Sequence, residues 1–237
     1  MRTLCITLIS LFLAFSSSHA QQEEISGFWF GPKLGPTVGM QNWDGLDRRA
    51  MFNYHGALFM ESLDPDYKGS LYAQLGYHSR GSALNIFTTF GAAARQAYTF
   101  NNIALQLGAK KRLITTTLST PYYFVGIRLE YQMNNNLAEL NERYNSPFYP
   151  VPDYVNDWTY GITFGGGIEF YGSEFIQPAL ELSISPDMSF QYFSPALGNI
   201  IHPFDGRTVT VNERKIRNIT LELSLSIRFL RKVVFID

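Results

Sequence analysis

Eight charged residues share one setting, because each lies in a segment where every second residue is apolar and each falls on the opposite, polar face. Arg128 and Glu130 show this within 123–133, and Glu222 and Arg228 show it within 219–229. Charges that face the interior of a protein must be paired, so such faces predict ion pairs. We expect a structural network that fills the interior, with a proton or ion path as the alternative. The eight are Lys33, Lys110, Arg128, Glu130, Glu169, Glu181, Glu222 and Arg228.

Histidine and serine are the candidates for catalysis, since His55, His78 and His202 follow the first 20 residues. His78 adjoins Ser79, but neighbouring residues of a strand point to opposite faces, so these side chains cannot pair directly. The glycines at 165–167 lie inside a predicted strand and not before a helix, and the acids at 44–47 lack the spacing of a calcium loop. We predict no catalytic, cofactor-binding or metal-binding residue, with an enzyme that modifies lipids or peptides as the alternative.

Two segments rich in aromatic residues and proline, 141–152 and 190–195, are the candidates for binding a protein partner. Binding residues concentrate in loops that a rigid scaffold holds in place. The same side chains could instead pack on each other, and the sequence leaves both readings open. The residues concerned are Arg143, Tyr144, Phe148, Tyr149, Tyr192 and Phe193.

The elements that must position these residues are strands, because the apolar residues recur with a period of two. A helix cannot hold such a set on one side. The pattern predicts eight strands, at about 27–41, 53–62, 71–77, 101–112, 123–133, 158–170, 176–185 and 219–229. Pro32 and Pro36 weaken the first, since proline cannot donate to a ladder, and the second is the least regular.

Long and short connections alternate along this series. The long ones, at about 42–52, 79–100, 134–157 and 186–217, would share one rim, and short turns would share the other. This asymmetry, with strands of about ten residues, is typical of a bacterial outer-membrane barrel. We predict an all-β, eight-stranded, antiparallel up-and-down transmembrane barrel in contact with outer-membrane lipid. A soluble periplasmic lipocalin-like barrel, with the two faces reversed, is the alternative.

The N-terminus reads as a secretory signal peptide, because Arg2 precedes an apolar run and small residues end at Ala20. We expect cleavage after Ala20, leaving a single barrel domain at 21–237 in the outer membrane. Cys5 is the one cysteine and lies in this leader, so disulfides and thiolate chemistry are not expected. Without Arg2, 18 basic residues face 20 acidic ones, and a net charge of −2 argues against nucleic acid as a partner.

The segments 102–110 (NIALQLGAK) and 164–170 (FGGGIEF), together with the leader and the eight repeats, resemble the small outer-membrane barrels of the PorT type found in Bacteroidetes. The resemblance covers most of the chain after the leader and is one of pattern. It implies an eight-stranded outer-membrane barrel, and it links the chain to type IX secretion through the named member of that family. We predict a non-enzymatic structural or accessory component of the envelope that binds an envelope or secretion-system protein through its loops or periplasmic turns.

Overall fold

The computed structural model describes residues 26–41, 48–63, 68–87, 93–113, 118–144, 150–201 and 206–233. The predicted leader at 1–20 and His202 lie outside these ranges. Eight long strands form where the period-two pattern predicts them. They are β1 (Ser26–Gln41), β3 (Met51–Ser62), β4 (Gly69–Phe87), β5 (Ala93–Arg112), β6 (Ser119–Asn135), β7 (Trp158–Phe170), β8 (Ile176–Pro186) and β13 (Asn218–Val233).

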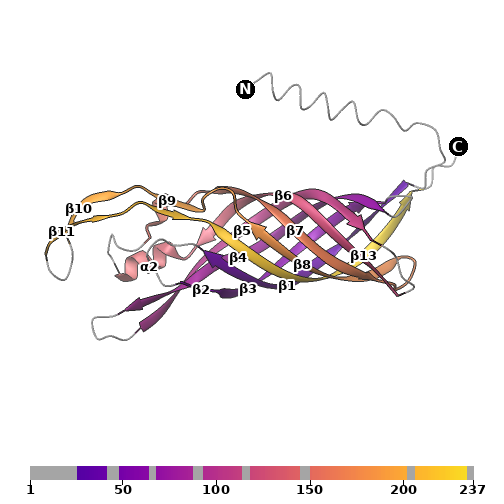
Figure 1. Cartoon of the computed structure of the whole chain (residues 1–237), viewed down its shortest axis with the longest axis horizontal. Helices are drawn as coiled ribbons and strands as arrows, with labels where there is room; N and C mark the ends of the chain where they lie inside the picture. The colour runs from indigo at the N-terminus through magenta and orange to yellow at the C-terminus, as the bar shows by residue number, and fades with distance from the viewer. Residues whose placement is uncertain are drawn as a thin grey trace, which may run out of the picture.

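These strands close into an antiparallel barrel. Each pairs with its neighbours in the chain, β4 pairs with β5, and the first and last strands, β1 and β13, join to complete the ring (Figure 1). At that junction Lys33 lies opposite Ser226 and Leu34 opposite Leu225. The prediction of an eight-stranded up-and-down barrel is therefore confirmed. Among the described residues, no helix is long and apolar enough to cross a membrane.

The two faces of the wall differ sharply in polarity. Leu223 is 44% exposed on the outside, whereas its neighbours Glu222 and Ser224 are buried in the lumen at 5% and 1%. The same holds on β6, where Ile127 is 65% exposed between the buried Gly126 and Arg128. An apolar outer surface is stable in lipid and costly in water. The soluble alternative, which needs the apolar face inside, is therefore wrong.

One end of the barrel carries the short connections, which join β3 to β4, β5 to β6 and β7 to β8. The other end carries the long connections, with one correction. The segment predicted as a loop at 79–100 is mostly a hairpin, because β4 and β5 stay paired from Ser79 and Asn101 out to Phe87 and Ala93. Residues 79–83 do not alternate between buried and exposed, because Ser79, Arg80, Ser82 and Ala83 are all at most 5% exposed.

The described parts of the other long connections lie at the same end of the barrel as this hairpin, and together with it they form what we call the platform (Figure 1). It contains the outer halves of β4 and β5, and six short elements: α2 (Leu137–Tyr144), the 3-10 helix η1 (Pro152–Tyr154), β9 (Tyr192–Ser194), β10 (Leu197–Ile201), β11 (Thr208–Val211) and β12 (Arg214–Ile216). A two-residue strand, β2 (Arg48–Arg49), pairs with β4 beside it. The platform has an apolar core of its own, made of Tyr98, Phe100, Leu137, Leu140, Tyr192 and Ile216.

Candidate functional site

Among the residues that the structure describes, twelve lysine, arginine, aspartate and glutamate side chains lie in the lumen, all at most 9% exposed. Six are cations and six are anions, so their formal charges cancel. All eight charges predicted for the interior are among them. The cations are Lys33, Arg80, Lys110, Arg112, Arg128 and Arg228, and the anions are Glu61, Glu130, Glu169, Glu181, Asp187 and Glu222.

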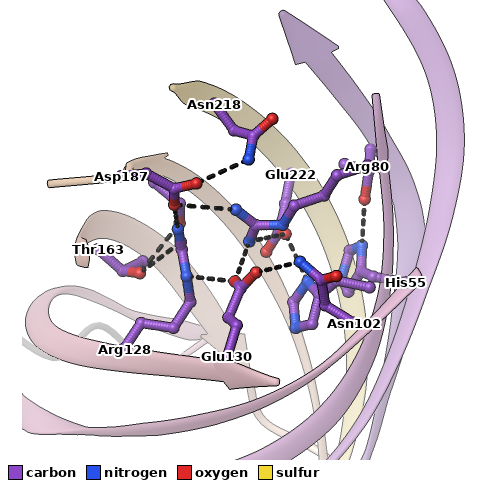
Figure 2. A network of polar contacts seen from close by, with 12 residues as sticks. His55, Arg80, Asn102, Arg128, Glu130, Thr163, Asp187, Asn218 and Glu222 are labelled. Carbon is purple, nitrogen blue, oxygen red and sulfur yellow. Dashed lines mark hydrogen bonds and ion pairs between the residues drawn. The ribbon is translucent and has the colours of Figure 1, made fainter. Parts of the chain in front are cut away.

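Five of these residues form a cluster at the platform end, which we call the platform cluster (Figure 2). Arg80 places one guanidinium nitrogen 2.8 Å from Glu130 and another 3.4 Å from Asp187. Arg128 contacts the same two carboxylates from the opposite side, with its Nε 2.5 Å from Glu130 and an Nη on Asp187. Glu222 completes the cluster, 3.8 Å from Arg80. Two arginines and two acids thus alternate in a ring, and each charge has two opposite neighbours.

Neutral side chains use the hydrogen-bonding capacity that the ion pairs leave. Asn102 donates to Glu130 at 2.7 Å, and Asn218 donates to Asp187 at 2.7 Å. Thr163 accepts a 3.3 Å hydrogen bond from Arg128. The cluster is not fully satisfied, because Arg80 Nε and Asn102 Oδ1 are buried without a hydrogen-bond partner among the described residues. Ion pairing between the arginines and the carboxylates is therefore what chiefly offsets the burial of charge.

Two histidines lie below this ring, with their imidazoles stacked at 5.6 Å. His78 Nδ1 lies 2.7 Å from Glu222, and His55 lies between Thr37 and Ser224, 2.9 Å from each hydroxyl oxygen. The serine and histidine have the distance of a nucleophile and its base. Both side chains are at most 2% exposed in this structure.

A second group, the turn cluster, lies near the short turns. Glu61 and Glu169 accept ion pairs from Lys110, Arg112 and Arg228, which come from β5 and β13. Arg228 lies 2.7 Å from Glu169, and Arg112 Nε lies 2.9 Å from the same carboxylate. Every member is 8% exposed or less.

Lys33 and Glu181 form a separate pair at 2.6 Å, and Tyr122 donates a 2.9 Å hydrogen bond to the same carboxylate. The Tyr122 ring also lies 3.8 Å from the Lys110 ammonium, which links this pair to the turn cluster. The cavity that remains beside these residues has a volume of about 30 Å³. It has room for one or two waters. The lumen is therefore plugged by its own side chains and lacks a wide pore along these positions.

The charges predicted as one network thus form separate groups, which corrects the sequence-based picture. Arg128 and Glu130 belong to the platform cluster, whereas Glu169 and Arg228 belong to the turn cluster. Alternation gives the face of each residue but not its height in the barrel.

Four of the twelve lumen charges are not among the eight predicted. Arg112 lies at the end of the predicted strand at 101–112. Arg80 and Asp187 fell in segments expected to be loops, and Glu61 was hidden because its inward neighbours on β3 include the apolar Ala57 and Phe59. The sequence could have indicated Glu61, because it lies an even number of residues from His55 and therefore on the same face of the strand. Within the described residues, no group of histidine, cysteine, aspartate and glutamate is arranged to hold a metal ion.

The residues predicted to contact a partner differ in their exposure to solvent. Tyr192 is 1% exposed, its ring packs edge-on against Tyr154 at 6.2 Å, and its hydroxyl oxygen accepts a hydrogen bond from the backbone of Val151. It is a core residue of the platform and not a surface residue. Phe193 is 40% exposed. Arg143 and Tyr144 end α2, with side chains outside the described set, and Phe148 and Tyr149 lie outside the described residues.

Comparison with known proteins agrees with this geometry. The family model described as "Outer membrane protein beta-barrel domain" matches residues 15–194. OprG from Pseudomonas aeruginosa superposes with a TM-score of 0.54 at 9% identity, over 89% of this chain and 99% of that one. Neisserial surface protein A gives a TM-score of 0.45 at 11% identity, over 87% and 99%. AlkL in lipid bilayers gives 0.44 at 9% identity, over 93% and 97%.

No curated protein sequence matches the chain. The family model nevertheless covers more than half of its length, and the exposed apolar wall and polar lumen are those of a barrel that sits in lipid. The chain belongs to the outer membrane protein beta-barrel domain family.

Proposed function

We propose that this protein is a non-enzymatic anchor in the outer membrane that presents its platform to a protein partner of the cell envelope. The observation that carries the proposal is the apolar core of the platform, whose six residues are at most 3% exposed. Flexible loops do not build such a core. Rigid surfaces bind at lower entropic cost than flexible ones, so a packed extension favours recognition.

The filled lumen supports this role and argues against conduction. An eight-stranded barrel has an interior that side chains can fill. Here charged side chains fill it both near the platform and near the short turns. The membrane-spanning part is therefore a stable support, and the features that differ from a plain barrel lie at its ends.

The outward side of the platform has the composition of a binding surface. The guanidinium of Arg217 stacks 4.3 Å from the ring centre of Phe190, and the Lys215 ammonium lies 5.5 Å from the exposed ring of Phe193. Aromatic residues and arginine are enriched at the energetic centres of protein interfaces. Ile201, 70% exposed on β10, extends this surface toward the tip.

The resemblance to PorT-type barrels supports a partner within a secretion assembly of the envelope, type IX secretion among them. In this proposal the first 20 residues direct export and are removed, and the platform faces outward, as the long loops of outer-membrane barrels do.

A photo-crosslinking amino acid at Phe193 tests the proposal in cells that make the protein naturally. The matched control replaces Phe175, which is 56% exposed at the turn end. We expect a discrete protein adduct from position 193 and none of the same mass from position 175. Equal adducts from both positions, or none from 193, would contradict the platform as the binding surface.

A shortened hairpin adds a second test. Ser194 and Arg214 lie opposite each other, so an Asn-Gly turn can join them and remove β10 and β11 while keeping Tyr192 and Ile216. The barrel should still fold, as judged by the heat-modifiable gel shift. Its adduct from position 193 should weaken if β10 and β11 contribute to binding, whereas loss of the folded band would show that they are structural.

A further inference from the structure

The turn end of the barrel contains a cup of about 620 Å³, on the side opposite the platform. Its volume is in the range of small-molecule sites, which is about 300–1,000 Å³. Inward-facing residues of several strands make its floor and walls, and the β7–β8 turn makes part of its rim. The residues that matter for binding are Trp29, Arg112, Glu169, Tyr171, Arg228 and Lys232.

The turn cluster, of which Arg112, Glu169 and Arg228 line the cup, carries excess positive charge. In the turn cluster three cations, Lys110, Arg112 and Arg228, share only two carboxylates, those of Glu61 and Glu169. The nearby Lys33 is matched one to one by Glu181, so it does not change the balance. An uncompensated buried charge is unfavourable, and an anion that enters the cup would compensate it.

The walls add an apolar and aromatic component. The Trp29 side chain, only 3% exposed, stacks on the guanidinium of Arg228 with its ring centre 4.5 Å away. Phe170 and Leu230 line the same space. Such walls favour a ligand with an apolar or aromatic body.

The rim offers one accessible cation. Lys232 is exposed, its ammonium lies 5.9 Å from the ring centre of Phe175, and among the described residues no carboxylate forms an ion pair with it. The one acid on the rim is Glu174. Counting all lining residues, Arg112, Arg228 and Lys232 outnumber Glu169 and Glu174 by three to two.

We propose that this cup binds an organic anion whose carboxylate or phosphate group meets the excess cation of the floor and whose apolar or aromatic body packs against Trp29. The site is distinct from the platform and does not depend on the partner proposed for it. Because short turns face the periplasm in outer-membrane barrels, this site would open to the periplasm.

The fluorescence of Trp29 reports binding directly. The chain has three tryptophans, so replacing Trp43 and Trp158 with phenylalanine leaves Trp29 as the single emitter in the folded, detergent-solubilised protein. Three probes share one aromatic body: phenylacetate, phenyl phosphate and the neutral phenylacetamide. We expect a saturable change in emission with at least one of the two anions and a much weaker response to the amide.

Two variants locate the site without touching the buried cluster. Lys232→Gln should weaken anion binding about fivefold, because it removes the rim cation. Arg231→Gln, the adjacent cation on the outward face, should leave binding unchanged. A response to phenylacetate alone assigns the group as a carboxylate, and a response to phenyl phosphate alone assigns it as a phosphate. Equal responses to all three probes, no response to either anion, or equal effects of the two variants would overturn the proposal.

Discussion

The apolar belt can be measured along β13, and its height makes a quantitative prediction. The outward residues from Ile219 to Phe229 span ten residue steps, or about 33 Å along the strand. With a tilt of about 40° the belt is about 25 Å tall, which equals the apolar band of outer-membrane barrels. Leu223 lies one step from the centre of this belt, about 3 Å from the membrane midplane, whereas Ile219 lies at its edge.

Arginine at these two positions should therefore have unequal costs. Leu223→Arg should lower the free energy of unfolding by about 2–4 kcal/mol, and Ile219→Arg by about 0–1 kcal/mol, since the penalty falls toward the interface. The two side chains have nearly equal exposure, 44% and 43%, so the contrast isolates depth in the membrane from packing.

The measurement is a guanidinium unfolding titration of the protein in liposomes, followed by tryptophan fluorescence. For the wild type and for each variant, the unfolding and refolding curves must coincide, which shows that the transition is reversible. Equal losses for the two variants would refute the assigned position of the membrane. A cost below 1 kcal/mol at Leu223 would refute the outward assignment of this face.

Two further experiments test how closely the strands pack and which lumen charges interact. Gly35→Ala should cost about 1–3 kcal/mol, because a Cβ there would overlap the carbonyl oxygen of residue 223 on the paired strand. Gly56→Ala, where no atom comes closer than 4.0 Å, should raise stability by about 0.5–1 kcal/mol; the same titration decides, and equal effects would contradict the close strand approach. In double-mutant cycles, Arg128 should couple to Asp187 by about 1–3 kcal/mol and to Glu181 by less than about 0.5 kcal/mol, because these belong to separate clusters. Strong coupling to Glu181 would join the two clusters.

The barrel was predictable from sequence because lipid imposes a strict rule on its wall. Every outward residue of β6 between Tyr123 and Met133 must be apolar, and the lumen tolerates anything that finds a partner. The rule ends where the membrane ends. Ser79, Arg80, Ser82 and Ala83 are all at most 5% exposed, so both faces of this part of β4 are covered by other residues and no alternation marks it.

The ion pairs were not predictable, although the faces of their members were. Lys33 and Glu181 are 148 positions apart, and their meeting depends on the stagger of strands around the barrel. Alternation repeats every two residues and carries no information about stagger. The same limit explains why Tyr192 was expected at the surface, since its burial depends on Tyr154 and Ile216 from other segments.

The lumen charges have a further consequence for how the ring closes. The junction strands β1 and β13 carry Lys33, Glu222 and Arg228, whose partners Glu181, His78 and Glu169 lie on β8, β4 and β7. If β13 slipped by two residues against β1, every apolar side chain would still face lipid. Contact with lipid would therefore not disfavour the shifted pairing. Each charge on the slipped strand would move about 7 Å away from its partner. The buried ion pairs therefore distinguish the correct closure from its nearest misfolded rivals, a choice that lipid alone cannot make.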